Sequence, residues 1–235
     1  MDSSIVLGLE KENSGTSPTG HKEFDRDGYL VIEDIYDPDE LYRSVPEPTQ
    51  QGASIRYNED GDIQSTRDET QVPGSVASYN YPQYKKVHSI LREKIENIIG
   101  KKLYETYYYD RFYYPKQQLD YHIDRPSCEI SVSVHIGTNL TQKWPFIIKT
   151  PDTYSDFGKT SRVSIGESSS LILKPGDGVI YKGCERPHWR TPMPLEYERK
   201  WFIKRVKPNL YYHQVFFHYV LQDGRRCHHA YDNTL

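Results

Sequence analysis

YHID at residues 121–124 and KPGDGVIYKGCERPHWR at residues 174–190 are the two stretches that decide the fold and the chemistry of this chain. The first places His122 and Asp124 two residues apart, and on a β-strand such residues project to the same face. The second supplies a distant histidine, His188. Two imidazoles and one carboxylate form the ligand set that holds non-haem Fe(II) on one face and leaves the opposite face open. We therefore expect His122, Asp124 and His188 to form a metal site if the fold brings them together.

A cation accompanies the distal histidine. Arg190 follows His188 by two residues, so both side chains face the same way if this stretch is extended. A guanidinium that points toward a metal site requires an anion, and a carboxylate is its natural bidentate partner. Four of the other histidines, His88, His135, His213 and His218, are expected to pack rather than to bind metal.

The segments around these two stretches are mostly short and alternating, which is typical of β-strands. The most regular helical pattern runs from about residue 84 to 99, where apolar residues recur every three or four positions before Gly100. A short helix is expected to begin at Asp37. Residues 46–81 are polar and interrupted by Pro and Gly, and this pattern predicts long loops. Strands are expected at residues 28–36, 103–114, 129–136, 145–149, 170–173, 178–181 and 213–221.

Many short strands, with helix confined to the N-terminal part, predict an α+β, mainly β fold with no βαβ units. Residues 1–20 include a stretch rich in Ser, Thr, Gly and Asn, which predicts a flexible N-terminal tail. Residues 21–235 are expected to form a single domain. A basic insertion at residues 200–209 separates His188 from the last strand.

Composition excludes several classes of function. The net charge of −3 and the absence of a dense basic stripe argue against nucleic-acid binding. No apolar run approaches the length of a membrane span, and no apolar segment near Met1 indicates secretion. The three cysteines lack CxxC spacing, so reduced thiols and a cytoplasmic location are expected. No P-loop, Gly-x-Gly-x-x-Gly or Gly-x-Ser-x-Gly motif is present.

From about Gly28 to Gly224 the chain resembles the 2-oxoglutarate and Fe(II)-dependent dioxygenases, especially their prolyl-hydroxylase-like branch. The resemblance implies a double-stranded β-helix, or jelly-roll, core with the N-terminal helices packed on it. It also implies that His122 and Asp124 end one strand of the barrel and that His188 lies on a later one. The segments that carry it are Tyr114-Pro115, residues 122–128, residues 175–177, residues 181–185 and residues 188–190.

The resemblance also implies roles for the co-substrate residues, with one departure. Members of the family usually carry Arg or Lys about ten residues after the distal histidine, at the start of the last strand. In this chain that position falls beside Arg199, at the edge of the basic insertion, and the last strand contains no cation. Arg190 is the first choice to hold 2-oxoglutarate, with Lys207 or Arg199 next. Tyr114 matches a position that often hydrogen-bonds the co-substrate, whereas Arg111 and Tyr113 are weaker candidates.

The expected function is thus a hydroxylase that uses Fe(II), 2-oxoglutarate and O₂ on a peptide or small-molecule substrate and releases succinate and CO₂. Retention of Asp124 favours hydroxylation over halogenation, because a halogenase would vacate that ligand for a halide. Two alternatives stay open, since this fold hosts many functions. One is a cupin-like metalloenzyme that does not use 2-oxoglutarate, and the other is a non-catalytic β-roll binding domain.

Overall fold

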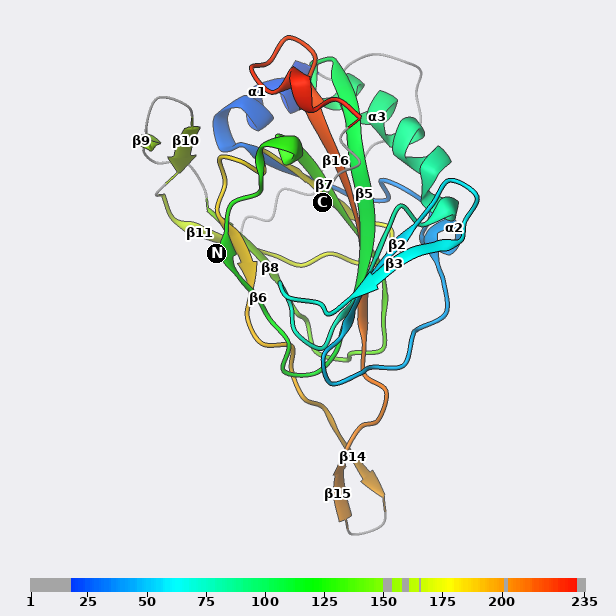
Figure 1. Ribbon diagram of the computed structural model, residues 1–235. Coiled ribbons are helices and arrows are strands. Elements are labelled where there is room, and N and C mark those ends of the chain that lie inside the picture. Colours follow the sequence, from blue (N-terminus) through cyan, green and yellow to red (C-terminus); the bar gives the residue numbers. More distant parts are fainter. Residues whose placement is uncertain (1–17, 150–153, 158–160, 165, 201–202, 232–235) are drawn as a thin grey trace.

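The core of the protein is a β-sandwich whose larger layer has eight strands (Figure 1). The computed structural model describes residues 18–149, 154–157, 161–164, 166–200 and 203–231. In spatial order the larger sheet contains β1 (Tyr29–Ile32), β12 (Gly178–Tyr181), β7 (Ile130–Thr138), β16 (Tyr212–Leu221), β5 (Leu103–Tyr113), β4 (Val76–Tyr79), β2 (Ala53–Tyr57) and β3 (Ile63–Arg67).

The smaller sheet faces the centre of the larger one. Its strands, in spatial order, are β11 (Ser168–Leu171), β8 (Phe146–Lys149), β13 (His188–Arg190) and β6 (Leu119–His122). From β5 onward the chain passes repeatedly between the two sheets, and β12, β7, β16 and β5 are neighbours in the larger one. Every pairing among these core strands is antiparallel. This winding is a double-stranded β-helix, so the expected fold class is confirmed.

The helices cover the outer face of the larger sheet. They are α1 (Pro18–Asp27), α2 (Pro38–Leu41) and α3 (Lys85–Ile99), with 3₁₀ turns at Pro82–Tyr84, Pro126–Cys128 and Cys227–His229. Val87, Leu91, Ile95 and Ile99 of α3 are buried with residues of β5, β7 and β16. Each such side chain contributes about 1.5–3 kcal/mol of burial free energy. Gly100 ends α3 in the left-handed conformation, with φ of 65°, which glycine adopts without strain.

From Tyr107 to Tyr113, beyond an irregularity in the pairing with β16, the side chains of β5 alternate between the interior and the outer face, and this alternation positions the site. Asp110 points outward and is fully buried, where it accepts hydrogen bonds from Arg43, His213 and Tyr84. Burial raises the pKa of Asp110, but His213 and Arg43 outweigh this and lower it to about 2. This charged cluster fastens the segment after α2 to β5, and the next residue, Arg111, therefore points into the barrel.

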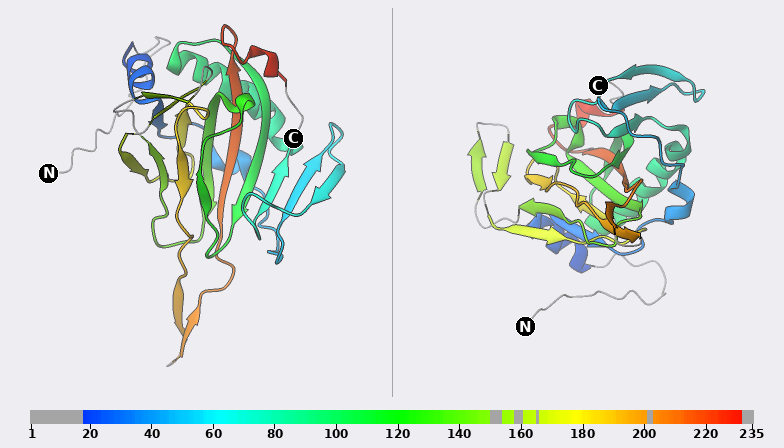
Figure 2. Two further views of the ribbon diagram at one scale, coloured as in Figure 1. Left: turned by 60° about the vertical axis from the view of Figure 1, so that its left-hand side comes forward. Right: turned by 90° about the horizontal axis from the view of Figure 1, so that it is seen from below.

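Two hairpins project from the sandwich. The strands β9 (Tyr154–Phe157) and β10 (Ser161–Ser164) form one, and β14 (Tyr197–Lys200) and β15 (Ile203–Val206) form the other. The second extends well beyond the end of the barrel in two orientations (Figures 1 and 2). No helix in the described parts of the chain combines the length and apolar character needed to cross a bilayer.

Most of the expected elements are present, and one region differs. Residues 46–81 were expected to be long loops, but they contribute β2, β3 and β4, which extend the larger sheet beyond β5. None of the side chains of β2 and β3 is fully buried, and such strands lack the apolar alternation that identifies half-buried strands from sequence. Residues 1–17 of the expected tail lie outside the described residues, and α1 begins at Pro18, inside the expected tail.

Candidate metal and co-substrate site

Strand pairing brings the three expected metal ligands together. In the register of β6 and β13, His122 lies directly opposite His188, and Asp124 follows just beyond the end of β6. Asp124 Oδ1 lies 3.6 Å from His122 Nε2 and 3.5 Å from His188 Nε2. One ligand atom from each residue lies within 4.8 Å of the others. The three side chains thus form one compact donor set at the junction of two strands.

Hydrogen bonds to the backbone orient both imidazoles. His122 Nδ1 lies 2.7 Å from the carbonyl oxygen of Asp120, and His188 Nδ1 lies 2.9 Å from that of Arg186. Because a carbonyl oxygen only accepts, each Nδ1 carries the proton and each Nε2 is left with a lone pair. This is the outer-shell arrangement that fixes the tautomer of metal-binding histidines. Both Nε2 atoms are therefore prepared to bind a cation.

A chain of two side chains supports the carboxylate. Ser131 Oγ donates to Asp124 Oδ2 at 2.8 Å, and His218 Nδ1 lies 3.0 Å from the same Ser131 oxygen. Because the serine proton is directed at Asp124, its lone pair accepts the Nδ1–H of His218. The backbone N–H of Asp124 also donates to Gly183 O at 2.9 Å. A Cβ at Gly183 would overlap Asp124 Oδ2, so only glycine permits this approach.

The charges at the site suit a divalent cation. Burial alone would raise the pKa of Asp124, but His188 and His122 beside it hold that pKa well below its ordinary value. Burial lowers the pKa of His122, whereas Asp124 raises it more, so that the net shift is upward. The carboxylate is thus ionised, and its negative charge attracts a proton to the site. A bound cation would replace that proton and satisfy the same charge.

A second group of potential ligands shares Asp124 with the first and consists of Asp124, Cys128 and His218. Burial raises the pKa of Cys128 well above its ordinary value, and a protonated thiol is a poor metal ligand. Cys128 Sγ instead lies 3.1 Å from the hydroxyl of Tyr107. His218 forms a hydrogen bond with Ser131 through its Nδ1 atom. This second group therefore supports the first rather than competing with it.

Below the metal ligands, a row of buried polar side chains crosses the larger sheet. Arg111 lies opposite Gln214 in the pairing of β5 with β16, and Gln214 lies opposite His135 in the pairing of β16 with β7. All three are at most 2% exposed. Among the described residues, Arg111 Nε and Nη1, Gln214 Oε1 and His135 Nε2 have no hydrogen-bond partner. Each unpaired buried group costs about 1–3 kcal/mol, so this row is arranged for a polar ligand.

Arg190 approaches the interior from the smaller sheet. Its guanidinium donates to Trp144 O at 2.8 Å and to the hydroxyl of Tyr212 at 3.3 Å, and it lies 4.6 Å from the ring centroids of both. Its Nε has no partner among the described residues. The ring of Phe146 contacts both His188 and Arg190. Arg190 is thus a buried cation next to the metal ligands, and its described hydrogen-bond partners are uncharged.

The other expected co-substrate residues lie elsewhere. Tyr114 packs with Val76 and Phe112, and its hydroxyl donates to Pro46 O at 2.6 Å, outside the barrel. Arg199 is exposed on β14, and Lys207 donates to Asn139 O at 2.7 Å. None of these three side chains contacts the interior row. Tyr113, one residue earlier, points inward instead, and its buried hydroxyl has no partner among the described residues.

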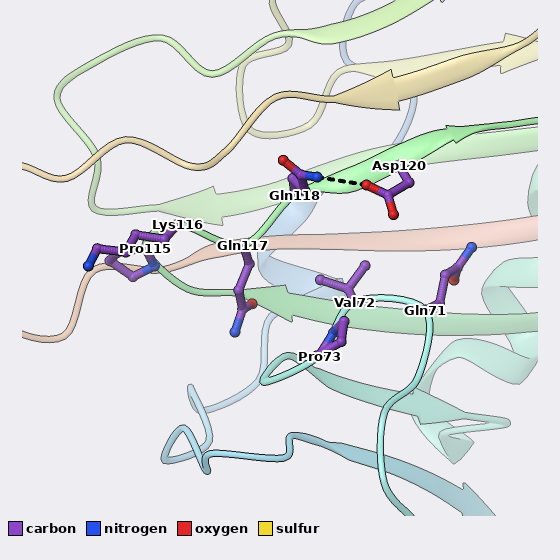
Figure 3. Close-up of a pocket in the computed structure, with 8 residues that line it drawn as sticks. All are labelled: Gln71, Val72, Pro73, Pro115, Lys116, Gln117, Gln118 and Asp120. Carbon is purple, nitrogen blue, oxygen red and sulfur yellow. Dashed lines mark hydrogen bonds between the residues drawn. The ribbon is translucent and has the colours of Figure 1, made fainter.

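A surface pocket of about 350 Å³ lies beside β6, the strand that carries Asp120 and His122 (Figure 3). Its lining residues come from the loop before β4, from the turn between β5 and β6, and from β6 itself, and they are Gln71, Val72, Pro73, Pro115, Lys116, Gln117, Gln118 and Asp120. Asp120 supplies the carbonyl that orients His122. Gln71 Oε1 accepts a hydrogen bond from Arg111 at 2.9 Å. Two residues of the pocket lining thus contact His122 and Arg111, which are not themselves part of the lining.

Ser131, His218, Arg111 and Gln214 are the site residues that the sequence reasoning missed or undervalued. Strand alternation was the sequence signal that could have identified them. Ser131, Ser133 and His135 share one face of β7, and His218 and Gln214 share the inner face of β16. Choosing which face points inward requires the partner sheet. His135 donates from Nδ1 to Leu173 O at 2.9 Å, and among the described residues it is not part of either group of potential ligands.

Comparison with known proteins supports the fold. No protein-family model matches the sequence, and no curated protein is detectably similar to it. Among solved structures, a Burkholderia pseudomallei oxidoreductase of the 2OG-Fe(II) oxygenase family aligns over 92% of this chain and 95% of its own, at 12% identity and a TM-score of 0.53. A Pseudomonas putida prolyl-4-hydroxylase aligns over 85% of this chain and 97% of its own, at 12% identity and a TM-score of 0.50.

A third structure similar to this chain is EctD from S. alaskensis, solved with 2-oxoglutarate and 5-hydroxyectoine. It aligns over 91% of this chain and 79% of its own, at 15% identity and a TM-score of 0.52. At sequence identities of 12–15%, the structural similarity establishes the fold alone. The chain therefore has the double-stranded β-helix fold of the 2-oxoglutarate and Fe(II) oxygenases.

Proposed function

We propose that this protein is an Fe(II)- and 2-oxoglutarate-dependent dioxygenase that hydroxylates an unactivated C–H bond of a peptide or small molecule, with release of succinate and CO₂. The observation that carries the proposal is the approach of His122 Nε2 and His188 Nε2 to one oxygen of Asp124, at 3.6 and 3.5 Å. Two imidazoles and one carboxylate on one face are the donor set of non-haem Fe(II) oxygenases. The shared fold makes this the favoured chemistry.

The residues at the site fit such a metal ion. His122, Asp124 and His188 would hold it, since their donor atoms are oriented by backbone carbonyls and by Ser131 before any ion is bound. When bound, Fe(II) supplies the open coordination positions at which 2-oxoglutarate and O₂ react. The remaining contributions, which are binding, orientation and exclusion of water, belong to the protein.

Arg190 is the residue we assign to the distal carboxylate of 2-oxoglutarate. Its side chain is 1% exposed, and its described hydrogen bonds go only to a carbonyl and a phenol. A buried cation without a carboxylate is stabilised by a ligand that brings one. The position of Arg190 supports this role, because its guanidinium lies against Tyr212 at the start of β16, and the resemblance implies a cation at the start of the last strand.

The aromatic residues around Arg190 exclude water from this ligand. Trp144 and Tyr212 enclose the guanidinium, and Tyr113 packs edge-on against Trp144 at 5.2 Å between centroids. In such a dry site a charge-assisted hydrogen bond is stronger than in water. The unpaired hydroxyl of Tyr113 supplies a further donor for the carboxylate. We assign Tyr113 the role that the sequence pattern suggested for Tyr114.

A cupin-like enzyme that does not use 2-oxoglutarate would explain the metal ligands, but it would not account for Arg190. A non-catalytic β-roll would explain neither the ligands nor the unpaired polar atoms of the interior. The buried arginine thus favours the 2-oxoglutarate-dependent reaction over both alternatives.

The test is production of succinate from 2-oxoglutarate in air with added Fe(II). Wild-type protein is expected to form succinate even without a primary substrate, at a low rate, and His188→Ala to form none. His228→Ala is the matched control, because His228 is exposed and outside the metal group, and it is expected to behave as wild type. Equal succinate formation by wild type and His188→Ala would reject the proposal.

A further inference from the structure

Arg111 is a second buried arginine in the barrel, and Arg190 does not account for it. Its side chain is fully buried on the inner face of β5. Only Nη2 is engaged, with Glu69 Oε1 at 3.3 Å and Gln71 Oε1 at 2.9 Å. Nε and Nη1 have no partner among the described residues. Three N–H groups of one guanidinium therefore remain available inside the protein.

The ion pair with Glu69 leaves Nε and Nη1 of Arg111 without a hydrogen-bond partner among the described residues. The same Glu69 oxygen also accepts the backbone N–H groups of Gln71 and Val72, at 2.8 and 3.2 Å. The Glu69 carboxylate thus stabilises the turn of residues 69–72, and it contacts Arg111 only once. If Arg111 served only to anchor this loop, one nitrogen would suffice. Burial of the two unpaired nitrogens would then lower the stability of the fold with no compensating interaction.

Aromatic rings separate Arg111 from Arg190. The guanidinium of Arg111 lies 5.8 Å from the ring centroid of Tyr113, which packs against Trp144, and Trp144 in turn covers Arg190. Arg111 and Arg190 also lie on opposite sheets, on β5 and β13. The interior therefore contains two separate places for an anion. The co-substrate places one carboxylate at the metal and one on a cation, so it requires only one of the two arginines.

Arg111 lies on the side of the barrel next to the surface pocket. Gln71, which accepts from Arg111, lines that pocket together with Asp120, whose carbonyl orients His122. Figure 3 shows Gln71 and Val72 on the loop and Asp120 on the strand on the other side of the pocket. The lining of this pocket thus contacts Arg111 through Gln71 and His122 through the backbone of Asp120.

We propose that Arg111 binds a carboxylate of the primary substrate, which makes the substrate a carboxylic acid that enters from the pocket bordered by Gln71 and Asp120. This inference rests on the proposed function and adds the substrate class to it. Arg190 then serves the co-substrate and Arg111 the substrate. Gln214, opposite Arg111 with an unpaired Oε1, offers an acceptor for a hydroxyl or amine of the same molecule.

The first measurement separates the two arginines. The affinity for 2-oxoglutarate is determined anaerobically with Fe(II), from the visible charge-transfer absorption, for wild type, Arg111→Gln and Arg190→Gln. Loss of a charged hydrogen bond is expected to weaken 2-oxoglutarate about tenfold or more in Arg190→Gln. Arg111→Gln is expected to bind it as wild type does. If Arg111→Gln loses 2-oxoglutarate as strongly, Arg111 holds the co-substrate and the inference is overturned, while the proposed function stands.

The second measurement asks whether Arg111 binds a carboxylate. The probe is sodium acetate, with acetamide and NaCl at equal concentration as the neutral comparison, and the readout is Tm in the presence of Fe(II) and saturating 2-oxoglutarate without O₂. Acetate is expected to raise the Tm of wild type and Arg111→Lys by a few degrees and not to raise that of Arg111→Gln. Arg199→Gln is the matched control, since Arg199 is exposed on β14, and it is expected to respond fully.

Glu69→Gln tests the inference independently of any misfolding of the Arg111 variants, because it leaves Arg111 in place. It retains the size of the side chain and removes the competing charge, so it is expected to strengthen the acetate response. No acetate-specific response in wild type, an undiminished response in Arg111→Gln, or an unchanged response in Glu69→Gln would each overturn the inference. If the Fe(II)·2-oxoglutarate absorption never appears, the proposed function fails, and the same acetate titration on metal-free protein still decides the role of Arg111.

Discussion

Ser131 connects the interior of the larger sheet to Asp124, one of the three proposed metal ligands. It donates to Asp124 and accepts from His218, so it fixes the carboxylate oxygen that is not shared by the two histidines. Outer-shell hydrogen bonds of this kind typically contribute 10–100-fold to metal affinity. The ligands alone therefore do not determine how tightly the ion is held.

Ser131→Ala is accordingly expected to weaken Fe(II) binding about tenfold or more, because Asp124 loses its oriented hydrogen bond. The measurement is an anaerobic Fe(II) titration without co-substrate. Ser133→Ala is the control, because Ser133 lies two residues along the same face of β7 and bonds Gln214 rather than Asp124. An equal loss of affinity in both variants would show that the effect is not specific to the Ser131–Asp124 bond.

Gly183 is the second residue on which the site depends. A Cβ there would overlap Asp124 Oδ2 and also approach Cys128 O and Ser131 Oγ. Gly183→Ala is expected to lower the free energy of unfolding by about 1–3 kcal/mol and to abolish tight Fe(II) binding, as measured by urea denaturation and metal titration. Gly137→Ala should have little effect, because the nearest atom to its added Cβ is Tyr211 Oη at 3.7 Å. A fully active Gly183→Ala would contradict the geometry described here.

At the scale of elements, strand alternation explains both what the sequence predicted and what it did not. The helix ending at Gly100 carries a strong periodic pattern, and the strand of residues 178–181 is a short apolar run that follows a Gly-Asp-Gly turn. Both are observed within a residue of the expected bounds. The aromatic run DRFYYP at residues 110–115 carries no such pattern, because buried residues occur on both faces of β5. Tyr114 was preferred because it matches a position of the family, whereas Arg111 and Tyr113 were ranked lower because alternating strand residues could equally serve packing. A shift of one residue exchanges the faces, so the sequence alone does not show which of these side chains points inward.

The three candidate ligands, His122, Asp124 and His188, could be proposed from sequence because two imidazoles and one carboxylate are a donor set typical of non-haem Fe(II). The residues that support them could not, because Ser131 and His218 lie 87 positions apart and meet only through the pairing of β7 with β16. Arg190 was predicted by its spacing from His188, without knowledge of the rings that enclose it. The sequence thus predicted the donors, and the tertiary fold determined their environment.

The hairpin of β14 and β15 is expected to be dispensable for co-substrate binding. Tyr197 pairs with Val206 at its base, so residues 198–205 can be replaced by Asn-Gly, which favours a two-residue hairpin turn. The shortened protein lacks Arg199 and is expected to bind 2-oxoglutarate with unchanged affinity and to retain its Tm within a few degrees. Loss of 2-oxoglutarate binding on shortening would return the co-substrate role to the hairpin and away from Arg190.

At the scale of the whole molecule, buried neutral histidines make the stability depend on pH. Burial lowers the pKa of His88 to about 3 and that of His135 and His218 to about 4. It also lowers the pKa of His213, against the opposing effect of Asp110. In the unfolded chain each of these groups titrates at about 6.5. Below that pH the unfolded state binds protons that the folded state does not, so stability falls as pH decreases.

Each such histidine contributes a slope of about 1.4 kcal/mol per pH unit between its unfolded and folded pKa values. In metal-free protein His122 opposes this trend, because its pKa is raised, but it is one group against four. The urea midpoint is therefore expected to fall steadily from pH 7 to pH 5, and less steeply in His88→Gln. A midpoint that stays constant or rises over this range would show that these histidines are not buried in the neutral form.

The central claim is that His122, Asp124 and His188 hold Fe(II) and leave positions open for 2-oxoglutarate. The most direct test is an anaerobic titration of Fe(II), with and without 2-oxoglutarate, on wild type and on His188→Ala, following the weak visible metal-to-ligand charge-transfer absorption. The account predicts an absorption that requires both additions and is absent from His188→Ala. Iron binding without that absorption, or an absorption that persists in His188→Ala, would contradict it.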